Sequence, residues 1–157
     1  SWKTLQPLKK ALALKGSGRL KALEASFALN TYQNRQLLPY LIEAAGDSYS
    51  RISEIVLKNM LPFFGQAGAS MLLGSLDFDA GKAEGEKLKY LLKNLSGLEK
   101  DGLVKTVLDG PSLEFIKILL KMERPQRWMQ AHLLELTQSR SPEVATLATR
   151  AVEKLGG

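Results

Sequence analysis

The stretch SPEVATLATRAVEKLGG, residues 141–157, carries the clearest helix signals in the chain and decides the fold. Ser141 suits the position that caps a helix N-terminus, and Pro142 suits the first helical turn, where its missing N–H is no loss. Glu143 follows at the end where the helix dipole favours an acid. Gly156 can adopt the left-handed conformation that ends a helix. These signals predict one well-delimited helix.

Within this helix the apolar residues recur every three or four positions, which predicts a single apolar stripe. The stripe consists of Val144, Leu147, Ala148, Ala151, Val152 and Leu155. An apolar stripe of this kind needs a neighbouring helix to cover it. We therefore expect Leu147 and Val152 to be largely buried, packed against the preceding helix around Leu133 and Leu136.

The rest of the chain has the same helical periodicity, and no stretch alternates with the period of two that is typical of strands. About ten helices are expected. The stretch 50–65, SRISEIVLKNMLPFFG, predicts one of these helices. Phe63 and Phe64, at its end, are expected to lie in the core. The buried side is expected to hold Ile52, Ile55, Val56, Met60 and Phe63.

The helices fall into pairs that repeat along the chain. The second helix of each pair, the B helix, is expected to begin near Arg19, Ser50, Glu84, Ser112 and Pro142, which gives steps of 31, 34, 28 and 30 residues. Regular steps of this size are typical of helical repeat proteins. The expected repeats within a single domain, 1–157, are 1–33, 34–65, 66–96, 97–123 and 124–157.

Two segments resemble the HEAT-like, armadillo-type repeats of α-solenoid proteins, especially their short bacterial kind. They are LLPYLIEAAGDSYSRISEIVLKNMLPFFG (37–65) and LLELTQSRSPEVATLATRAVEKLGG (133–157). Each has a first helix, a polar turn, and a B helix that ends in a hydrophobic residue plus glycine. The resemblance implies an all-α fold, a right-handed α-solenoid of about five helical hairpins. It also implies that the B helices line the concave face.

Composition limits the function classes further. The chain has 157 residues, no cysteine and a formal charge of +6, so disulfides and thiolate metal sites are excluded. The six bases of residues 1–21, Lys15 among them, precede the first acid, and residues 24–157 carry 16 bases and 16 acids. No apolar run is long enough to span a membrane. We expect a cytoplasmic protein and, because the sequence begins with Ser1 and shows no signal peptide, a fragment of a longer one.

No residue pattern indicates catalysis or a bound cofactor. His132 is the only histidine and is expected to be a partly exposed helix residue, neither base nor ligand. Asp77 and Asp79 resemble the start of a calcium loop, but the later positions lack the required glycine and glutamate. Trp128 is expected to pack in the core or between repeats. We therefore expect no enzyme, no metal and no cofactor.

Basic residues recur on the polar sides of the expected B helices. Four of these five helices each have a formal charge of +1, and the last is neutral. One interpretation is ordinary solvation of a helix face; the other is a basic concave groove for a partner. The candidate partner-binding residues are Arg19, Lys21, Arg51, Lys58, Lys89, Lys93, Lys117, Lys121 and Arg150.

Two function classes follow. The first is a protein-interaction scaffold that binds an acidic segment of a partner or a neighbouring domain of its own chain. The alternative is a nucleic-acid-binding solenoid. HEAT-like DNA glycosylases of bacteria resemble this chain in fold class, but no acid stands out beside Trp128, so glycosylase activity is not expected. The sequence does not indicate an oligomeric state.

Overall fold

The computed structural model describes residues 2–14, 16–79 and 82–156, with side chains described for 5–14, 16–79 and 84–156. These residues form helices, turns and loops and contain no strand, which confirms the all-α prediction. Lys15, one of the bases of the N-terminal segment, lies outside the described residues. The chain divides into two compact units, unit 1 (residues 1–76) and unit 2 (residues 77–157).

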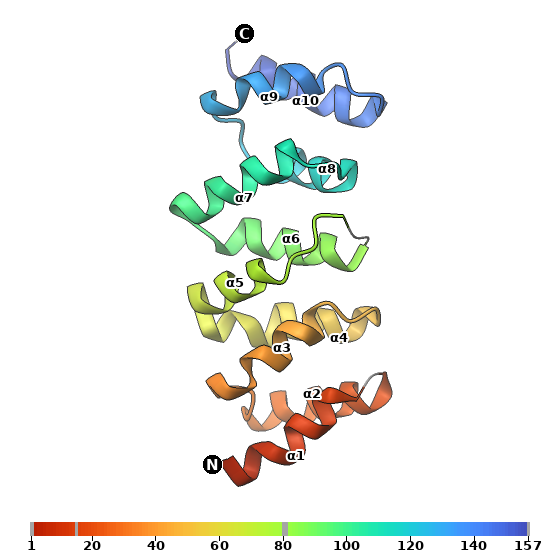
Figure 1. Ribbon diagram of the computed structural model, residues 1–157, viewed down its shortest axis with the longest axis vertical. Coiled ribbons are helices and arrows are strands. Elements are labelled where there is room, and N and C mark those ends of the chain that lie inside the picture. The colour runs from red at the N-terminus through yellow and green to blue at the C-terminus, as the bar shows by residue number, and fades with distance from the viewer. Residues whose placement is uncertain (1, 15, 80–81, 157) are drawn as a thin grey trace. The chain divides into compact units, whose positions relative to one another are not determined.

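Ten α-helices occur in the described part of the chain, the number expected from the periodicity (Figure 1). Unit 1 contains α1 (Trp2–Ala13), α2 (Ser17–Leu29), α3 (Leu38–Ala45), α4 (Ser50–Ile55) and α5 (Gly65–Gly74). Unit 2 contains α6 (Lys82–Asn94), α7 (Gly97–Asp109), α8 (Leu113–Met122), α9 (Gln130–Leu136) and α10 (Pro142–Lys154). Short helices precede α3 and α9, namely η1 (Arg35–Leu37) and η4 (Arg127–Met129).

In unit 1 the two helices of each pair pack on one another, and each helix of the first pair also packs on the next helix of the same kind. The first pair, α1 and α2, contacts the second pair, α3 and α4, through α1 against α3 and α2 against α4. Leucines and isoleucines from all four helices meet between the pairs and are fully buried. Among them are Leu12, Leu23, Leu41 and Ile52. Burial of this apolar surface supplies most of the stability of the unit.

The predicted helix 50–65 is not a regular α-helix along its length. After α4 the chain forms a π-helical turn, η2 (Val56–Met60), and then a 3-10 helix, η3 (Leu61–Phe64). Pro62 gives the physical reason, because within an α-helix its ring would clash with the carbonyl four residues earlier. The changed register places Pro62 in the first turn of η3.

The same change of register corrects the expected buried side of this segment. Phe63, expected in the core, is 55% exposed, and Phe64 is half-buried. Leu57 and Leu61 are buried instead. The segment therefore presents an aromatic side chain to solvent at the end of the second helical pair.

In unit 2 the helix α8 lies at the centre of the packing. It contacts α6, α7 and α10, and α10 also lies against α9 (Figure 1). Phe115 of α8 is 1% exposed and packs edge to face against Phe78 at a centroid distance of 6.0 Å. The core of unit 2 is thus built around α8.

The closing helix α10 has the predicted ends and a buried face narrower than the predicted stripe. Ser141 Oγ accepts a hydrogen bond from the Val144 N–H at 3.3 Å, and Gly156 has a φ of 89°. Leu147 and Val152, predicted to be largely buried, are half-buried rather than fully buried, so this prediction holds in part. The centre of the buried face is a narrower row, Val144, Ala148 and Ala151. Small side chains in this row allow the neighbouring helix to approach closely, which leaves the larger residues on either side of the contact.

Candidate partner-binding surface

The candidate bases lie on helices that are neighbours within each unit. In unit 1, α2 contacts both α4 and η2, and in unit 2, α8 contacts both α6 and α10. We call the exposed surface of α2, α4 and η2 the unit 1 face, and the exposed surface of α6, α8 and α10 the unit 2 face. The unit 1 face comprises four of the nine candidate residues by sequence, and the unit 2 face comprises five.

Arg19 belongs to the interior of unit 1. It is 3% exposed, and its Nε donates a hydrogen bond to the Leu12 carbonyl at 2.8 Å. Its two terminal nitrogens bind Asp47 Oδ2 at 2.7 Å and Glu43 Oε1 at 3.3 Å. The guanidinium thereby joins α1, α2 and the end of α3, so we leave it out of the candidate surface.

The other three bases of the unit 1 face are exposed. Lys58 Nζ lies 3.4 Å from Glu54 Oε1 one helical turn earlier, and both side chains are at least half exposed. Such a surface pair contributes little energy. Lys21 and Arg51 form no ion pair with any residue that the structure describes. Two cations of this face are therefore accessible.

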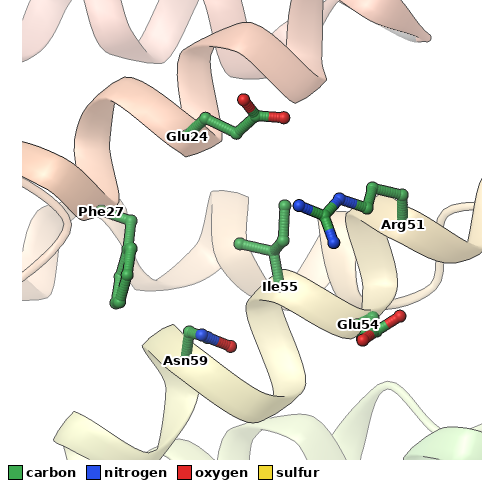
Figure 2. Close-up of a pocket in the computed structure, with 6 residues that line it drawn as sticks. All are labelled: Glu24, Phe27, Arg51, Glu54, Ile55 and Asn59. Atoms are coloured by element: carbon green, nitrogen blue, oxygen red, sulfur yellow. The ribbon is translucent and has the colours of Figure 1, made fainter.

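A hollow of about 310 Å³ separates α2 from α4 and η2 on this face. Phe27 and Ile55 project into the space between the helices, and Glu24 and the Arg51 guanidinium reach into the same space (Figure 2). The lining residues are Glu24, Phe27, Arg51, Glu54, Ile55 and Asn59. The lining thus combines two apolar side chains with four polar or charged ones.

An aromatic row continues from the hollow along the unit 1 face. Phe27 stacks on Tyr32 at a centroid distance of 6.1 Å, and Tyr32 meets Phe63 edge to face at 6.1 Å. Phe27 is 43% exposed, while Tyr32 is 5% exposed and contacts both phenylalanine rings. Phe63 was expected in the core, so this row was not predicted from the sequence. The Pro62–Phe63–Phe64–Gly65 sequence was the signal that the helix would not continue regularly.

The unit 2 face carries bases that are mostly paired with acids. Glu143 of α10 binds Lys121 Nζ at 2.8 Å and Lys117 Nζ at 3.4 Å, both from α8. On α6, Lys89 Nζ lies 3.2 Å from Glu86 Oε1. The hydrogen bond and the charge of Lys121 lower the pKa of the Glu143 carboxyl, and the same contacts raise the pKa of Lys121. Lys117 also lies 3.9 Å from Glu114.

Lys93 and Arg150 are the exceptions on the unit 2 face. Both are exposed, and neither forms an ion pair with a described residue. Arg150 lies beside Thr146, Thr149 and Glu153 on the outer side of α10. The structure therefore does not gather the five unit 2 candidates into one accessible cationic patch.

The side chains considered for catalysis or metal binding have structural partners. His132 Nδ1 lies 3.0 Å from Asp109 Oδ1, and the histidine side chain is 25% exposed, which confirms the predicted partly exposed position. Asp77 Oδ1 accepts a hydrogen bond from the Asp79 N–H at 2.9 Å, and the Asp77 N–H donates to buried Glu84. These contacts hold residues 77–79 in a turn next to Glu84. Over the described ranges, no three His, Cys, Asp or Glu side chains gather as a metal site.

Trp128 corrects another prediction. It was expected in the core or between repeats, but it is 41% exposed in the 3-10 helix that precedes α9. The buried residue of that short helix is Met129, which is 2% exposed. Because a short apolar run contains more hydrophobic residues than one helix face can bury, the sequence alone did not determine which of them faces the core.

Comparison with known proteins gives no match. No family model, curated protein or solved structure matches this chain. Within the described residues, no helix combines the length and the apolar character that crossing a membrane requires.

Proposed function

We propose that this chain is a non-enzymatic protein-interaction scaffold that holds a segment of a partner protein, or of another domain of its own chain, against the unit 1 face. The proposed architecture is a HEAT-like α-solenoid. Its support is the packing within each unit, where α2 lies on α4 and α8 lies on both α6 and α10. Successive contacts between helices of the same kind are the arrangement that a solenoid uses.

The observation that carries this proposal is the hollow between α2 and α4 with its aromatic wall. A bound apolar side chain would contact Phe27 and the nearly buried Ile55, which is 8% exposed. Aromatic residues and arginines near the centre of an interface supply much of its binding energy. Arg51 and Glu24 beside the hollow offer a donor and an acceptor that would fix the orientation of a bound segment.

Charge favours a protein segment over nucleic acid at this face. The hollow contains two carboxylates, those of Glu24 and Glu54, beside one guanidinium, that of Arg51. A phosphate backbone would be repelled by these carboxylates, whereas a polypeptide carries both donors and acceptors. The pairing of Lys117 and Lys121 with Glu143 likewise lowers the support for a continuous basic groove.

Site-directed photocrosslinking tests the proposal. A photoreactive phenylalanine analogue replaces Asn59, which lines the hollow, and in a matched protein it replaces Gln36, an exposed residue of η1 away from the face. Both proteins are irradiated in an extract of the source cells, and the adducts are identified by mass spectrometry. We expect a discrete peptide adduct at Asn59 and none at Gln36.

Three outcomes would contradict the proposal. Adducts to nucleic acid at Asn59 would favour the alternative function, the nucleic-acid-binding solenoid. Equal peptide yields at Asn59 and Gln36 would indicate non-specific contact. The absence of any adduct at Asn59, in a protein that is folded by circular dichroism, would remove the unit 1 face as the partner site.

A further inference from the structure

Helix α9 and the short helix η4 before it present apolar residues to solvent on the side opposite to their core contacts. Met129 and Leu133 are 2% and 0% exposed and attach the helix to unit 2. Trp128 and Leu134 are 41% and 50% exposed, and Ala131 between them is also exposed. Because three positions make a little less than one helical turn, Trp128, Ala131 and Leu134 lie along one face. We call these three residues the α9 stripe.

The tryptophan of the stripe is held in place by its own neighbour. The Trp128 indole N–H donates a hydrogen bond to Gln126 Oε1 at 3.0 Å. A side chain that is already oriented loses less conformational freedom when a partner binds it. Tryptophan is also among the residues that most often contribute large binding energies at protein interfaces. The geometry thus presents a pre-oriented aromatic anchor.

The charges around the stripe determine what can cover it. Residues 124–140 contain three arginines and a single acid, Glu135, so their formal charge is +2 with His132 neutral. Arg124, Arg127 and Arg140 are all exposed, and none forms an ion pair within the described ranges. An exposed apolar stripe in a segment with a net positive charge complements a helix whose own apolar face is bordered by acids.

We propose that the α9 stripe is a second docking surface, which binds an acidic amphipathic helix of a partner protein. It lies in unit 2 and is independent of the unit 1 face, so neither proposal requires the other. A second copy of this chain fits the stripe poorly, because a two-fold contact would bring the same arginines together. Nucleic acid fits poorly as well, because a row of stacking aromatics is absent from the stripe, which holds one tryptophan and two aliphatic residues.

Tryptophan fluorescence provides a direct test. The chain has two tryptophans, so the Trp2→Phe protein reports on Trp128 alone. The probe is a helical peptide with leucines along one face and glutamates elsewhere, compared with a peptide of the same composition in scrambled order. We expect the amphipathic peptide to shift the emission of Trp128 and the scrambled peptide to bind at least about tenfold more weakly.

Matched variants distinguish specific binding at the α9 stripe from non-specific binding elsewhere on the protein. Leu134→Ala should weaken binding by about five- to tenfold, whereas Leu98→Ala, at an 89% exposed leucine of α7, should leave it within about twofold. Arg127→Glu should weaken binding by a similar factor, and Lys105→Glu on α7 should have a smaller effect.

Other results would overturn the docking surface. These are equal binding of the scrambled peptide, an equal loss in the Leu98→Ala protein, or an unchanged Trp128 emission at saturating peptide. Vesicles of anionic phospholipid and a single-stranded RNA are titrated in parallel. A Trp128 response to either of these in place of the peptide would reassign the stripe to that ligand. Self-association that Leu134→Ala abolishes, measured by sedimentation, would reassign it to a second copy of the chain.

Discussion

On the unit 2 face Glu143 binds two lysines of the neighbouring helix, whereas on the unit 1 face Arg51 and Lys21 form no ion pair within the described residues. Two of the helices that carry these residues look alike in sequence, since α2 and α8 each have a formal charge of +1. Charge counted along a helix therefore does not give the charge that a partner meets. The charge of the exposed surface depends on which bases are paired with acids of the adjacent helix.

The two units as wholes also differ in their balance of bases and acids. Unit 1 contains nine bases and four acids, and unit 2 contains thirteen bases and twelve acids. Among its described residues, unit 1 also exposes Phe27, which lines the hollow, and Phe63, and its buried base Arg19 is used for packing. We infer that the face with fewer acids and more exposed aromatic surface is the one adapted to hold a partner.

The largest expected effect is the loss of stability of unit 1 when Arg19 is replaced. Arg19→Ala removes the buried guanidinium that joins α1, α2 and the end of α3, and it leaves Asp47, whose side chain is 8% exposed, without its partner. Removing one partner of a buried ion pair should lower the free energy of unfolding by about 3–5 kcal/mol. Urea denaturation followed by circular dichroism measures this change.

The matched control for Arg19 is Lys21→Ala, at an exposed position of the same helix. It should change the free energy of unfolding by less than about 0.5 kcal/mol. Equal destabilisation by the two substitutions would mean that the Arg19 contacts contribute nothing beyond helix propensity.

The next effect concerns the aromatic wall of the hollow. Phe27→Ala should reduce the yield of the Asn59 crosslink by about tenfold, because the ring forms the apolar side of the proposed pocket. Leu29→Ala serves as the control, since Leu29 is 74% exposed near the end of the same helix and does not line the hollow. An equal yield from the two proteins would show that the partner contacts the face without entering the hollow.

Local signals in the sequence predicted much of the fold. The ends of α10 follow from Ser141, Pro142 and Gly156, because capping depends on residues only a few positions apart. The helical periodicity predicted the number of α-helices. The break of the helix at Pro62 was missed, although proline was its cause.

The candidate site was harder to predict, because burial and pairing depend on residues far apart in sequence. Arg19 meets Asp47 across 28 positions, and Lys117 meets Glu143 across a whole helical pair. Periodicity identifies the apolar side of a helix, but it does not say how much of that side the neighbour covers. This is why Leu147 is only half-buried and Trp128 faces solvent.

A smaller effect is expected when the paired lysines of the unit 2 face lose their acidic partner. Glu143→Gln removes the carboxylate that binds Lys117 and Lys121, so Lys121 becomes available to an anionic ligand and Lys117 keeps only its longer contact with Glu114. Affinity for duplex DNA at low salt should rise by about fivefold and should fall again as salt is added. Glu86→Gln, which releases Lys89 alone, should raise the affinity by only about twofold. An unchanged affinity in the Glu143→Gln protein would show that the paired lysines were already accessible.

The smallest effect is a dependence on pH that follows from the lowered pKa of Glu143. The hydrogen bond and charge of Lys121 lower this pKa in the folded protein, so the carboxylate stabilises the folded state above its ordinary pKa. That contribution is lost as the pH falls from the ordinary pKa through the lowered one, where Glu143 takes up a proton and releases the two lysines. Polyanion affinity of the wild-type protein should therefore rise modestly toward acid pH, relative to that of the Glu143→Gln protein. Heparin binding, measured by fluorescence titration of both proteins across this range, checks the difference. Parallel pH profiles for the two proteins would mean that Glu143 does not control the accessible charge of the unit 2 face.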